Sequence, residues 1–234
     1  MTINHLRDSF DLSFYFVIGT ENLNGKDFRQ VVRQAIDGGI TFLQVRSKIL
    51  EAKELMNLGR IAAQEIKVAG KDNTIALVID DRVDIAQALR IEGVKIDGVH
   101  LGQNDIPPEA ARKILGENAI IGLSARSRDL FDYIKNFKSG IVDYFGAGPL
   151  HKTDTKPNCG LVNGIVVERN FDEIKALKAI CPLPLVIGGG VKYEDLDALK
   201  TTGVDGFFVV SAIASANDPL SAAKTLAQKW FSKS

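Results

Sequence analysis

The stretch TFLQVRSKILEAKELMNLGRIAAQEIKVAGKDNTIALVI, residues 41–79, decides the fold because it holds one complete strand–helix–strand unit. Two short runs rich in β-branched residues, 41–46 and 74–79, flank an amphipathic segment at 51–70. That segment ends on Gly70, the residue type that most readily adopts the left-handed conformation just past a helix. Two strands joined by a helix run parallel, so the unit predicts part of a parallel sheet.

The same unit recurs along the whole chain. Eight short apolar runs have the character of strands, in chain order 14–19, 41–46, 74–79, 96–102, 119–125, 141–148, 183–189 and 205–212. Eight units in 234 residues fit a (β/α)8 TIM barrel, which typically has about 250 residues. The alternative, a doubly wound open sheet, usually carries a G-x-G-x-x-G turn after its first strand, and this chain has IGTENLNG there. We therefore predict an α/β protein with a single (β/α)8 barrel domain over residues 1–234.

The composition is typical of soluble globular proteins and argues against several functions. Lys and Arg together number 29, as do Asp and Glu, so no broad basic surface for nucleic acid is expected. Cys159 and Cys181 lack metal-ligand spacing and are predicted to be reduced thiols. No segment approaches the roughly 20 apolar residues of a membrane helix, and the N-terminus does not resemble a signal peptide. We expect a cytoplasmic protein, as a monomer or a homo-oligomer.

Polar side chains follow the predicted strands at the end where barrels hold their active sites. Period-two alternation places Gln44, Arg46 and Lys48 on one side of the second strand. Further polar or glycine residues follow the later strands: Asp80, Asp81, His100, Gln103, Asp105, Ser124, Gly188–Gly190 and Ser211. Each has a simple structural alternative, such as a helix cap for Asp81 or a hydrogen-bonded core position for His100. Their gathering on one face favours a ligand site.

The residue types at these strand ends indicate anionic ligands. Positive charge comes from Arg46, Lys48 and Lys156, and hydroxyl donors come from Ser124, Thr153, Thr155 and Ser211. Backbone N–H groups in the loops after the seventh and eighth strands form the customary phosphate site of this fold.

Two carboxylates, Asp81 and Asp105, are expected at the same mouth of the barrel. At about 4 Å they would repel each other by roughly 4 kcal/mol. A divalent cation would relieve this repulsion, and ligands that are all oxygen favour Mg²⁺ over zinc. The sequence therefore predicts a Mg²⁺ site beside a bound diphosphate.

Seven motifs, in order, resemble those of the thiamine-phosphate synthase family. They are GGITFLQVRSK (38–48), VIDDRVDIA (78–86), DGVHLGQND (97–105), IIGLS (120–124), VDYFGAGPLHKTDTK (142–156), IGGGV (187–191) and DGFFVVSAI (205–213). The resemblance runs from about Phe14 to the last helix. It implies a transferase that joins 4-amino-2-methyl-5-(diphosphooxymethyl)pyrimidine to 4-methyl-5-(2-phosphooxyethyl)thiazole, or to its carboxylated form. The products would be thiamine phosphate and pyrophosphate, with Mg²⁺ assisting the departure of pyrophosphate.

The resemblance also implies a role for each matched position. The groups that would hold the pyrimidine diphosphate are Gln44, Arg46, Lys48, Ser124 and Lys156, all but Gln44 as catalytic residues. Mg²⁺ would bind Asp81 and Asp105. The thiazole phosphate would be held by Thr153, Thr155, Gly190, Val210 and Ser211. Four neighbours complete the predicted substrate-binding set: Val45, Ser47, Asp80 and Asp154. The segment 149–172 is predicted to be a lid loop over both substrates.

The chain departs from the family motifs at a few positions. Asp80 stands where asparagine is common, and Ser47 where glutamate is common. Gly188 replaces a common isoleucine, which is expected to loosen the turn there. Leu150-His151-Lys152 replaces a more apolar pair and a proline, a change expected to alter the lid.

Three other functions compete with the synthase. A related thiazole tautomerase would need a proton-transferring base, for which His100 and His151 are the histidine candidates. A non-catalytic binder would hold thiamine precursors without turnover. An unrelated barrel isomerase acting on a sugar phosphate would share the phosphate site after the last two strands, but the motif TDTK, residues 153–156, counts against it. Neither the tautomerase nor the binder has an evident need for the paired carboxylates Asp81 and Asp105, so the synthase is favoured.

Overall fold

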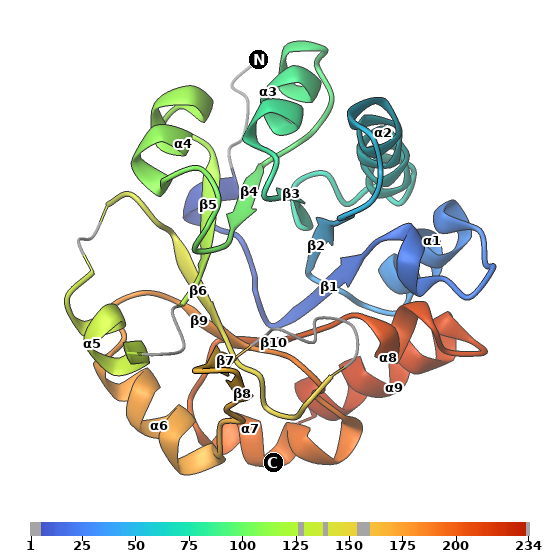
Figure 1. The fold of residues 1–234 in the computed structure, drawn as a ribbon. Helices are drawn as coiled ribbons and strands as arrows, with labels where there is room; N and C mark the ends of the chain where they lie inside the picture. The colour runs from blue at the N-terminus through green and yellow to red at the C-terminus, as the bar shows by residue number, and fades with distance from the viewer. Residues whose placement is uncertain (1–5, 126–128, 138–139, 154–159, 233–234) are drawn as a thin grey trace.

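Eight parallel strands close into a barrel in the computed structural model, which describes residues 6–125, 129–137, 140–153 and 160–232 (Figure 1). The strands are β1 (Phe14–Ile18), β2 (Phe42–Val45), β3 (Ala76–Asp80), β4 (Gly98–Leu101), β5 (Ile120–Ser124), β6 (Tyr144–Ala147), β9 (Leu185–Ile187) and β10 (Gly206–Val209). They are hydrogen-bonded in this order, and β10 closes the ring against β1. Each strand lies in its predicted run or one residue beyond it, so the predicted (β/α)8 barrel is confirmed.

Helices surround the barrel on its outer face (Figure 1). They are α1 (Phe28–Asp37), α2 (Ala52–Val68), α3 (Val83–Ile91), α4 (Pro108–Leu115), α5 (Leu130–Lys135), α6 (Phe171–Ile180), α7 (Leu196–Thr201), α8 (Ser211–Ala214) and α9 (Pro219–Phe231). Short 3₁₀ turns are η1 (Leu6–Asp8), η2 (Thr20–Asn22) and η4 (Tyr193–Asp195). Side-chain caps begin several helices; Asp27, for example, accepts from the Gln30 backbone N–H at 2.9 Å, which satisfies an otherwise unpaired donor.

Two apolar layers form because strand side chains alternate between the two faces of the barrel. Residues such as Leu43 and Val45 face outward into the core beneath the helices. Residues such as Tyr15, Phe42 and Tyr144 face inward and fill the barrel. The same alternation turns Gln44, between two outward-facing residues, toward the interior.

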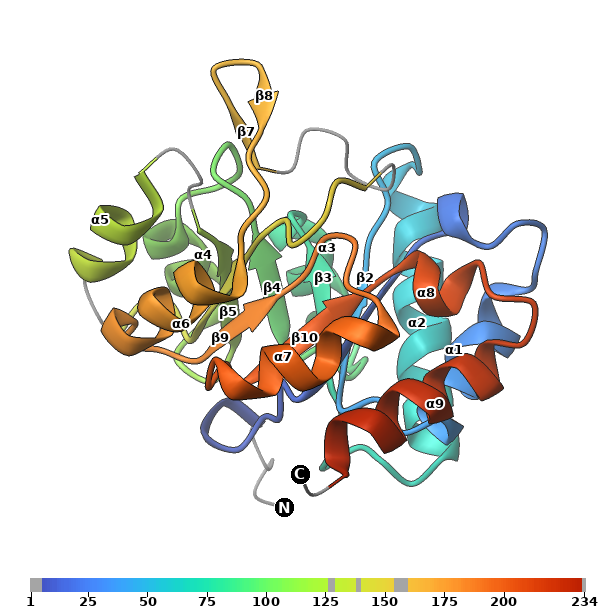
Figure 2. The same ribbon diagram turned by 90° about the horizontal axis from the view of Figure 1, so that it is seen from below.

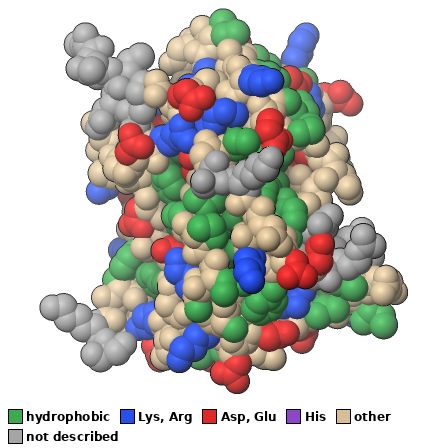
Figure 3. Space-filling view, turned by 90° about the vertical axis from the view of Figure 1, so that its left-hand side faces the viewer, with side chains coloured by type: hydrophobic (Ala, Val, Ile, Leu, Met, Phe, Trp, Pro, Cys, Tyr) green, Lys and Arg blue, Asp and Glu red, His purple; other side chains and the backbone are tan. Residues whose placement is uncertain are grey.

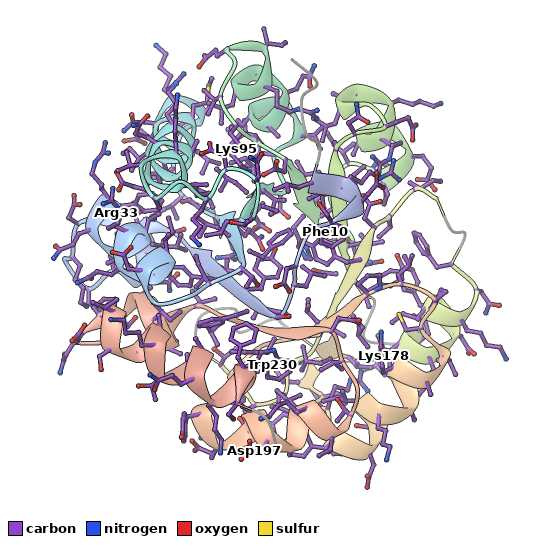
Figure 4. All side chains as sticks on the ribbon, turned by 180° about the vertical axis from the view of Figure 1, so that it is seen from behind. Phe10, Arg33, Lys95, Lys178, Asp197 and Trp230 are labelled. Atoms are coloured by element: carbon purple, nitrogen blue, oxygen red, sulfur yellow. The ribbon has the colours of Figure 1, made fainter. Side chains whose placement is uncertain are left out.

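The lower end of the barrel is closed by the N-terminal segment. Leu6 and Leu12 are buried among the inward-facing side chains, and Phe10 lies at the centre of the view from behind (Figure 4). Its ring packs on Phe42 and Tyr144, each at a centroid distance of 6.0 Å. The interior of the barrel is therefore accessible from the C-terminal ends of its strands.

A short antiparallel hairpin, β7 (Leu161–Val162) and β8 (Ile165–Val166), rises above those C-terminal ends, on the side opposite the two termini (Figure 2). Backbone hydrogen bonds from Val167 to Gly160, at 3.0 Å, and from Arg169 to Pro149, at 2.9 Å, fix its base. The hairpin belongs to the segment 149–172 that was predicted as a lid. The last two residues of that segment begin α6 instead.

The surface agrees with the balanced charge. On the face shown in Figure 3, basic and acidic side chains are interspersed and do not form a single basic patch. Among the described ranges, no helix has both the length and the apolar character needed to cross a membrane.

Candidate active site

A cavity of about 380 Å³ opens at the C-terminal ends of the strands. Many of the residues predicted to bind substrate line it: Gln44, Arg46, Asp80, Ser124, Thr153, Gly190, Val210 and Ser211. Apolar groups, including Val17, Ala147 and Phe208, form much of the remaining wall. The cavity thus combines an apolar floor with a few polar groups, as small-molecule sites commonly do.

One wall is a cluster of charged and amide groups from β2 and β3. Arg46 Nε lies 3.2 Å from Asp80 Oδ2, and Lys48 Nζ lies 3.9 Å from the same oxygen. Gln44 donates from Nε2 to the other oxygen of Asp80. Asp80 is almost completely buried, so these donors supply the partners that a buried carboxylate requires. The substitution of Asp for the common Asn thus places an anion between two cations.

Asp81, the next residue, has an unusual backbone conformation. Its φ of +58° is left-handed, a region that residues with a side chain adopt rarely and often at functional sites. Its backbone N–H donates to the His100 carbonyl at 2.8 Å, and its carboxylate pairs with Lys48 through Oδ2. The N-cap of α3 is Arg82, without a side-chain cap hydrogen bond. The helix-cap alternative for Asp81 is therefore wrong.

Asp105 approaches Asp81 at the neighbouring loop after β4. Its Oδ2 accepts from the Gly102 backbone N–H at 2.7 Å. A Cβ atom built on Gly102 would lie 2.7 Å from that oxygen and 3.9 Å from Asp81 Oδ1, so the two carboxylates flank the same glycine. Within the described parts of the chain, no three His, Cys, Asp or Glu side chains group together as a metal site. The two carboxylates offer only oxygen atoms, the ligand type that Mg²⁺ prefers, and Mg²⁺ usually takes its remaining ligands from water and substrate.

The adjoining wall, from β4 to β6, is hydrogen-bonded around His100, which lies beside Asp80 in the pairing of β4 with β3. Its Nδ1 lies 2.9 Å from the Tyr144 hydroxyl, and its Nε2 lies 3.0 Å from Ser124 Oγ. Tyr144 in turn lies 3.0 Å from the hydroxyl of Tyr15. Burial raises the pKa of both tyrosines above the ordinary phenol value, so both keep their protons.

The phosphate-type region is formed by the turn at Gly189–Gly190 and the start of α8 at Ser211. It lies across the barrel from β2 and β3, at the ends of β9 and β10. Gly189 and Gly190 have φ values of +79° and +72°, which glycine adopts without steric cost. A Cβ on Gly190 would lie 2.7 Å from the His151 carbonyl oxygen. Helix α8 begins at Ser211 beside this turn, and the first N–H groups of a helix lack partners within the helix. Such groups favour an anion.

Several predicted site residues lie elsewhere or cannot be placed. Val45 is fully buried in the outer core, so its side chain faces away from the cavity because strand residues alternate. Ser47 donates to Glu21 at 2.9 Å and accepts from the Ile49 and Leu50 N–H groups; it braces the loop after β2. Asp154, Thr155 and Lys156 lie outside the described residues.

The turn at Gly188 is not loosened, contrary to expectation. A Cβ there would lie 2.1 Å from the Phe208 ring, so Phe208 occupies the space that a larger residue would need. The Gly188 and Gly189 carbonyls accept from the Leu150 and His151 N–H groups at 2.9 to 3.1 Å. This turn is therefore closely packed.

His151 is held away from the cavity wall. Its Nε2 lies 3.0 Å from both carboxylate oxygens of Asp195, a buried residue of η4. This contact attaches the loop after β6 to the base of α7. Of the two histidines considered as bases, His100 is the one that lines the cavity.

Two further polar residues line the cavity. Gln103, a polar strand-end residue that was assigned no specific role from the sequence, donates to the Tyr133 hydroxyl at 3.1 Å. Asn104 was not singled out from the sequence. The buried tyrosines Tyr15 and Tyr144 lie just beneath the cavity. Alternation on β1 and β6 could have indicated that both side chains face inward. An aromatic residue inside an apolar run is, however, usually a core residue without a further role, so neither tyrosine was singled out.

The fold and the site together define a (β/α)8-barrel protein with cationic, carboxylate and phosphate-type regions around one cavity. A family model described as thiamine monophosphate synthase matches residues 14–213. A thiamine-phosphate synthase of Desulfitobacterium hafniense is 37% identical over 220 residues, which cover 94% of this chain and 98% of that protein. One from Azorhizobium caulinodans is 38% identical over 93% of this chain and 94% of that protein. The chain belongs to the thiamine monophosphate synthase family.

The solved structures agree. Thiamine phosphate pyrophosphorylase from Pyrococcus furiosus superimposes with a TM-score of 0.78 at 28% identity. The superposition covers 96% of this chain and 97% of that one. The family and the fold that the sequence motifs predicted are both confirmed.

Proposed function

We propose that this protein is a thiamine-phosphate synthase, a transferase that couples the pyrimidine diphosphate to the thiazole phosphate and releases pyrophosphate. Membership of the family supports the reaction class. The structural observation that supports it best is the placement of two different anion-binding regions around one cavity. Arg46 lines the cavity after β2, and Lys48, Asp81 and Asp105 lie at its border after β2 to β4, beside Asp80 and Gly102. The turn at Gly190 and the helix start at Ser211 line the cavity across the barrel. A two-substrate reaction in which each substrate carries phosphate requires such a pair.

The reaction breaks the bond between the pyrimidine methylene carbon and the diphosphate oxygen, and the electron pair leaves with pyrophosphate. The thiazole nitrogen then donates its lone pair to the methylene carbon. Arg46 and Lys48 would stabilise the negative charge on the leaving group, and the cavity would hold the two substrates in line. The protein needs no proton-transferring base for these steps.

Asp81 and Asp105 would hold Mg²⁺, which when bound supplies charge stabilisation to the departing pyrophosphate. In the structure, Lys48 pairs with Asp81 Oδ2, whereas Asp81 Oδ1 is the oxygen near Gly102. Asp81 can therefore offer one oxygen to a cation while the other stays with Lys48. Half of the Lys48 side chain is exposed, so it can also turn toward a phosphate.

The segment 149–172 would act as the lid. Its described part carries the β7–β8 hairpin above the cavity (Figure 2), and Thr153 lines the cavity wall. Closure over bound substrates would keep water from capturing the cationic methylene intermediate. The residues Asp154, Thr155 and Lys156, expected to contact the phosphates, belong to the same segment. The substrates are small molecules, and we propose that the enzyme acts in the cytoplasm.

The test is the formation of thiamine phosphate from the two substrates, followed by chromatography with each substrate omitted in turn. We expect product only with both substrates and Mg²⁺. Binding of the thiazole phosphate without any product would instead indicate a precursor-binding protein. Isomerisation of the thiazole alone would indicate a tautomerase.

A further inference from the structure

Six polar side chains form one hydrogen-bonded chain through the barrel interior, and each comes from a different strand. In order they are Asp80, Gln44, Tyr15, Tyr144, His100 and Ser124. This hydrogen-bonded chain starts at the charged wall of the cavity, passes beneath the cavity floor and reaches the cavity again at Ser124. Phe10 covers Tyr144 from below, so the middle of the chain is shielded from water.

The Asp80 end of the chain has a fixed direction. Arg46 and Lys48 flank Asp80 at 3.2 and 3.9 Å, and a carboxylate in such ion pairs can only accept hydrogen bonds. Gln44 must therefore turn its NH₂ group toward Asp80. Its carbonyl oxygen then faces Tyr15, and this oxygen can only accept.

The direction of each later hydrogen bond follows, because each hydroxyl has only one proton to donate. Tyr15 has a single hydroxyl proton and gives it to Gln44, so the Tyr15 oxygen must accept from Tyr144, 3.0 Å away. Tyr144 has then used its own proton and must accept from His100 Nδ1 at 2.9 Å. With the proton on Nδ1, the neutral imidazole offers Nε2 as an acceptor to Ser124 Oγ at 3.0 Å.

We propose that Asp80 is a positioning residue that sets the direction of this whole chain, holding His100 as the neutral Nδ1–H tautomer. In consequence the Ser124 hydroxyl donates to His100, and Ser124 presents its oxygen lone pairs to the cavity. The inference about Ser124 as a ligand group rests on the proposed function. The inference about His100 concerns the substrate-free protein.

An amide at position 80 would reverse the chain. In Asp80→Asn the oxygen of the new side chain must face the Arg46 guanidinium, because two donors repel each other. Its NH₂ group then faces Gln44, whose amide rotates and donates to Tyr15. Each later hydrogen bond then reverses its direction: Tyr15 donates to Tyr144, and Tyr144 donates to His100 Nδ1. His100 therefore carries its proton on Nε2 and donates to Ser124, whose hydroxyl is free to donate into the cavity.

The direct test is ¹⁵N NMR of the histidine ring nitrogens in the substrate-free protein, with the His100 signals assigned from their loss in His100→Asn. We expect a protonated Nδ1 and an unprotonated Nε2 in the wild type, and the opposite in Asp80→Asn. Asp84→Asn removes the same charge from an exposed ion pair with Arg82 and should leave the tautomer unchanged. A wild-type Nε2–H tautomer, a doubly protonated ring, or no change in Asp80→Asn would overturn the proposal.

Tyr15→Phe tests transmission through the chain without altering any charge. It frees the Tyr144 proton to donate to His100 Nδ1, so we expect His100 to shift toward the Nε2–H tautomer although Asp80 is intact. The ring packing on Phe42, at a centroid distance of 4.5 Å, is retained. An unchanged tautomer in folded Tyr15→Phe would show that the direction does not come from Asp80.

Binding of inorganic pyrophosphate tests the consequence for Ser124. Removing the Asp80 charge should strengthen pyrophosphate binding whether residue 124 is serine or alanine. With Ser124 present, its released hydroxyl should increase the affinity by roughly a further tenfold. The extra gain should vanish when Asp80→Asn is combined with Ser124→Ala. Equal effects of Asp80→Asn in both backgrounds would overturn the role given to Ser124. Since the NMR measurement needs no turnover, failure of the proposed function would be distinguishable from failure of this inference.

Discussion

The two ends of the barrel use the same residue types for different purposes. At the lower end, Asp143 accepts from Arg7, Arg112 and the Ile121 N–H group at 2.7 to 2.8 Å. Arg112 is buried and also donates to carbonyls, among them that of Ile141 at 2.9 Å. These groups are held by backbone partners on several sides, so this lower ion-pair cluster is structural.

At the upper end, the ion pairs of Arg46 and Lys48 with Asp80 and Asp81 line or border an open cavity. Lys48 is half exposed, and its partner Asp81 has a left-handed backbone. These pairs can exchange partners with a ligand. The difference shows that an Asp–Arg pair in a barrel has to be judged by its other hydrogen-bond partners. We propose that the upper cluster, Arg46, Lys48, Asp80 and Asp81, is the functional one.

Arg112→Ala should produce the largest loss of stability. It removes one partner of the Asp143 carboxylate, whose side chain is only 10% exposed, and the loss of one partner of a buried ion pair typically costs about 3–5 kcal/mol. The exposed pair Arg60–Glu92 provides a matched control, and Arg60→Ala should cost less than about 1 kcal/mol. Urea unfolding measures both. If Arg112→Ala were as mild as Arg60→Ala, the structural role of the lower cluster would be disproved.

Asp105→Ala should affect the chemistry and spare the fold. Loss of one of the two carboxylates proposed to bind Mg²⁺ should lower the rate of pyrophosphate release about 100- to 1,000-fold, by comparison with other groups that stabilise developing charge. The residue lies in a loop outside the core, so the urea midpoint should change little. Steady-state kinetics and unfolding on the same preparation separate the two effects. Activity retained with Mg²⁺ present would rule out Asp105 as a metal ligand.

Gly188→Ala should test the packing of the turn beside the phosphate-type region. The new methyl group would meet the Phe208 ring at 2.1 Å, and overpacking of this kind costs about 1–3 kcal/mol. Phe208→Ala in the same chain should recover part of the loss by making room. Thermal unfolding of the single and double variants decides the matter, and strictly additive losses would contradict the proposed contact.

Glu21→Gln should have the smallest effect. Burial raises the pKa of Glu21, but hydrogen bonds from the Lys48 N–H, from its own N–H and from Ser47, together with the charge of Arg46, outweigh it and lower the pKa. A lowered folded-state pKa contributes stability above the unfolded value, and this is lost as pH falls through the folded value. Solvent screening should keep the effect below about 1 kcal/mol.

The wild-type advantage over Glu21→Gln should accordingly be present at pH 7 and disappear in acid. Thermal melts of the two proteins from pH 3 to pH 7 measure it. An advantage that grew as pH fell would contradict the assignment.

The fold could be predicted from the sequence because each strand and helix carries its own local pattern. Period-two alternation likewise placed Gln44 inside the barrel. The same rule turns the Val45 side chain outward into the core, although Val45 was predicted as a substrate-binding residue because it stands between Gln44 and Arg46 in the motif. The positions that could not be predicted depend on contacts distant in sequence. Phe208 fills the space left by Gly188, and Glu21 holds Ser47.

The hydrogen bonds in the barrel interior could not be predicted from the sequence for the same reason. Tyr15 and Tyr144 lie 129 positions apart, and each is an ordinary core residue within its own apolar run. Only closure of the barrel brings their hydroxyls together. The direction of the chain from Asp80 to Ser124 follows from that arrangement and from no single motif.

The central claim, that the upper cluster acts on a departing pyrophosphate, is tested most directly by pyrophosphate release from the wild-type protein as Mg²⁺ is titrated. Both substrates should be present in one series, and each omitted in another. We predict release that needs both substrates, rises to saturation with Mg²⁺ and stops when EDTA is added. Release without the thiazole phosphate at the same rate, or release unaffected by EDTA, would contradict it.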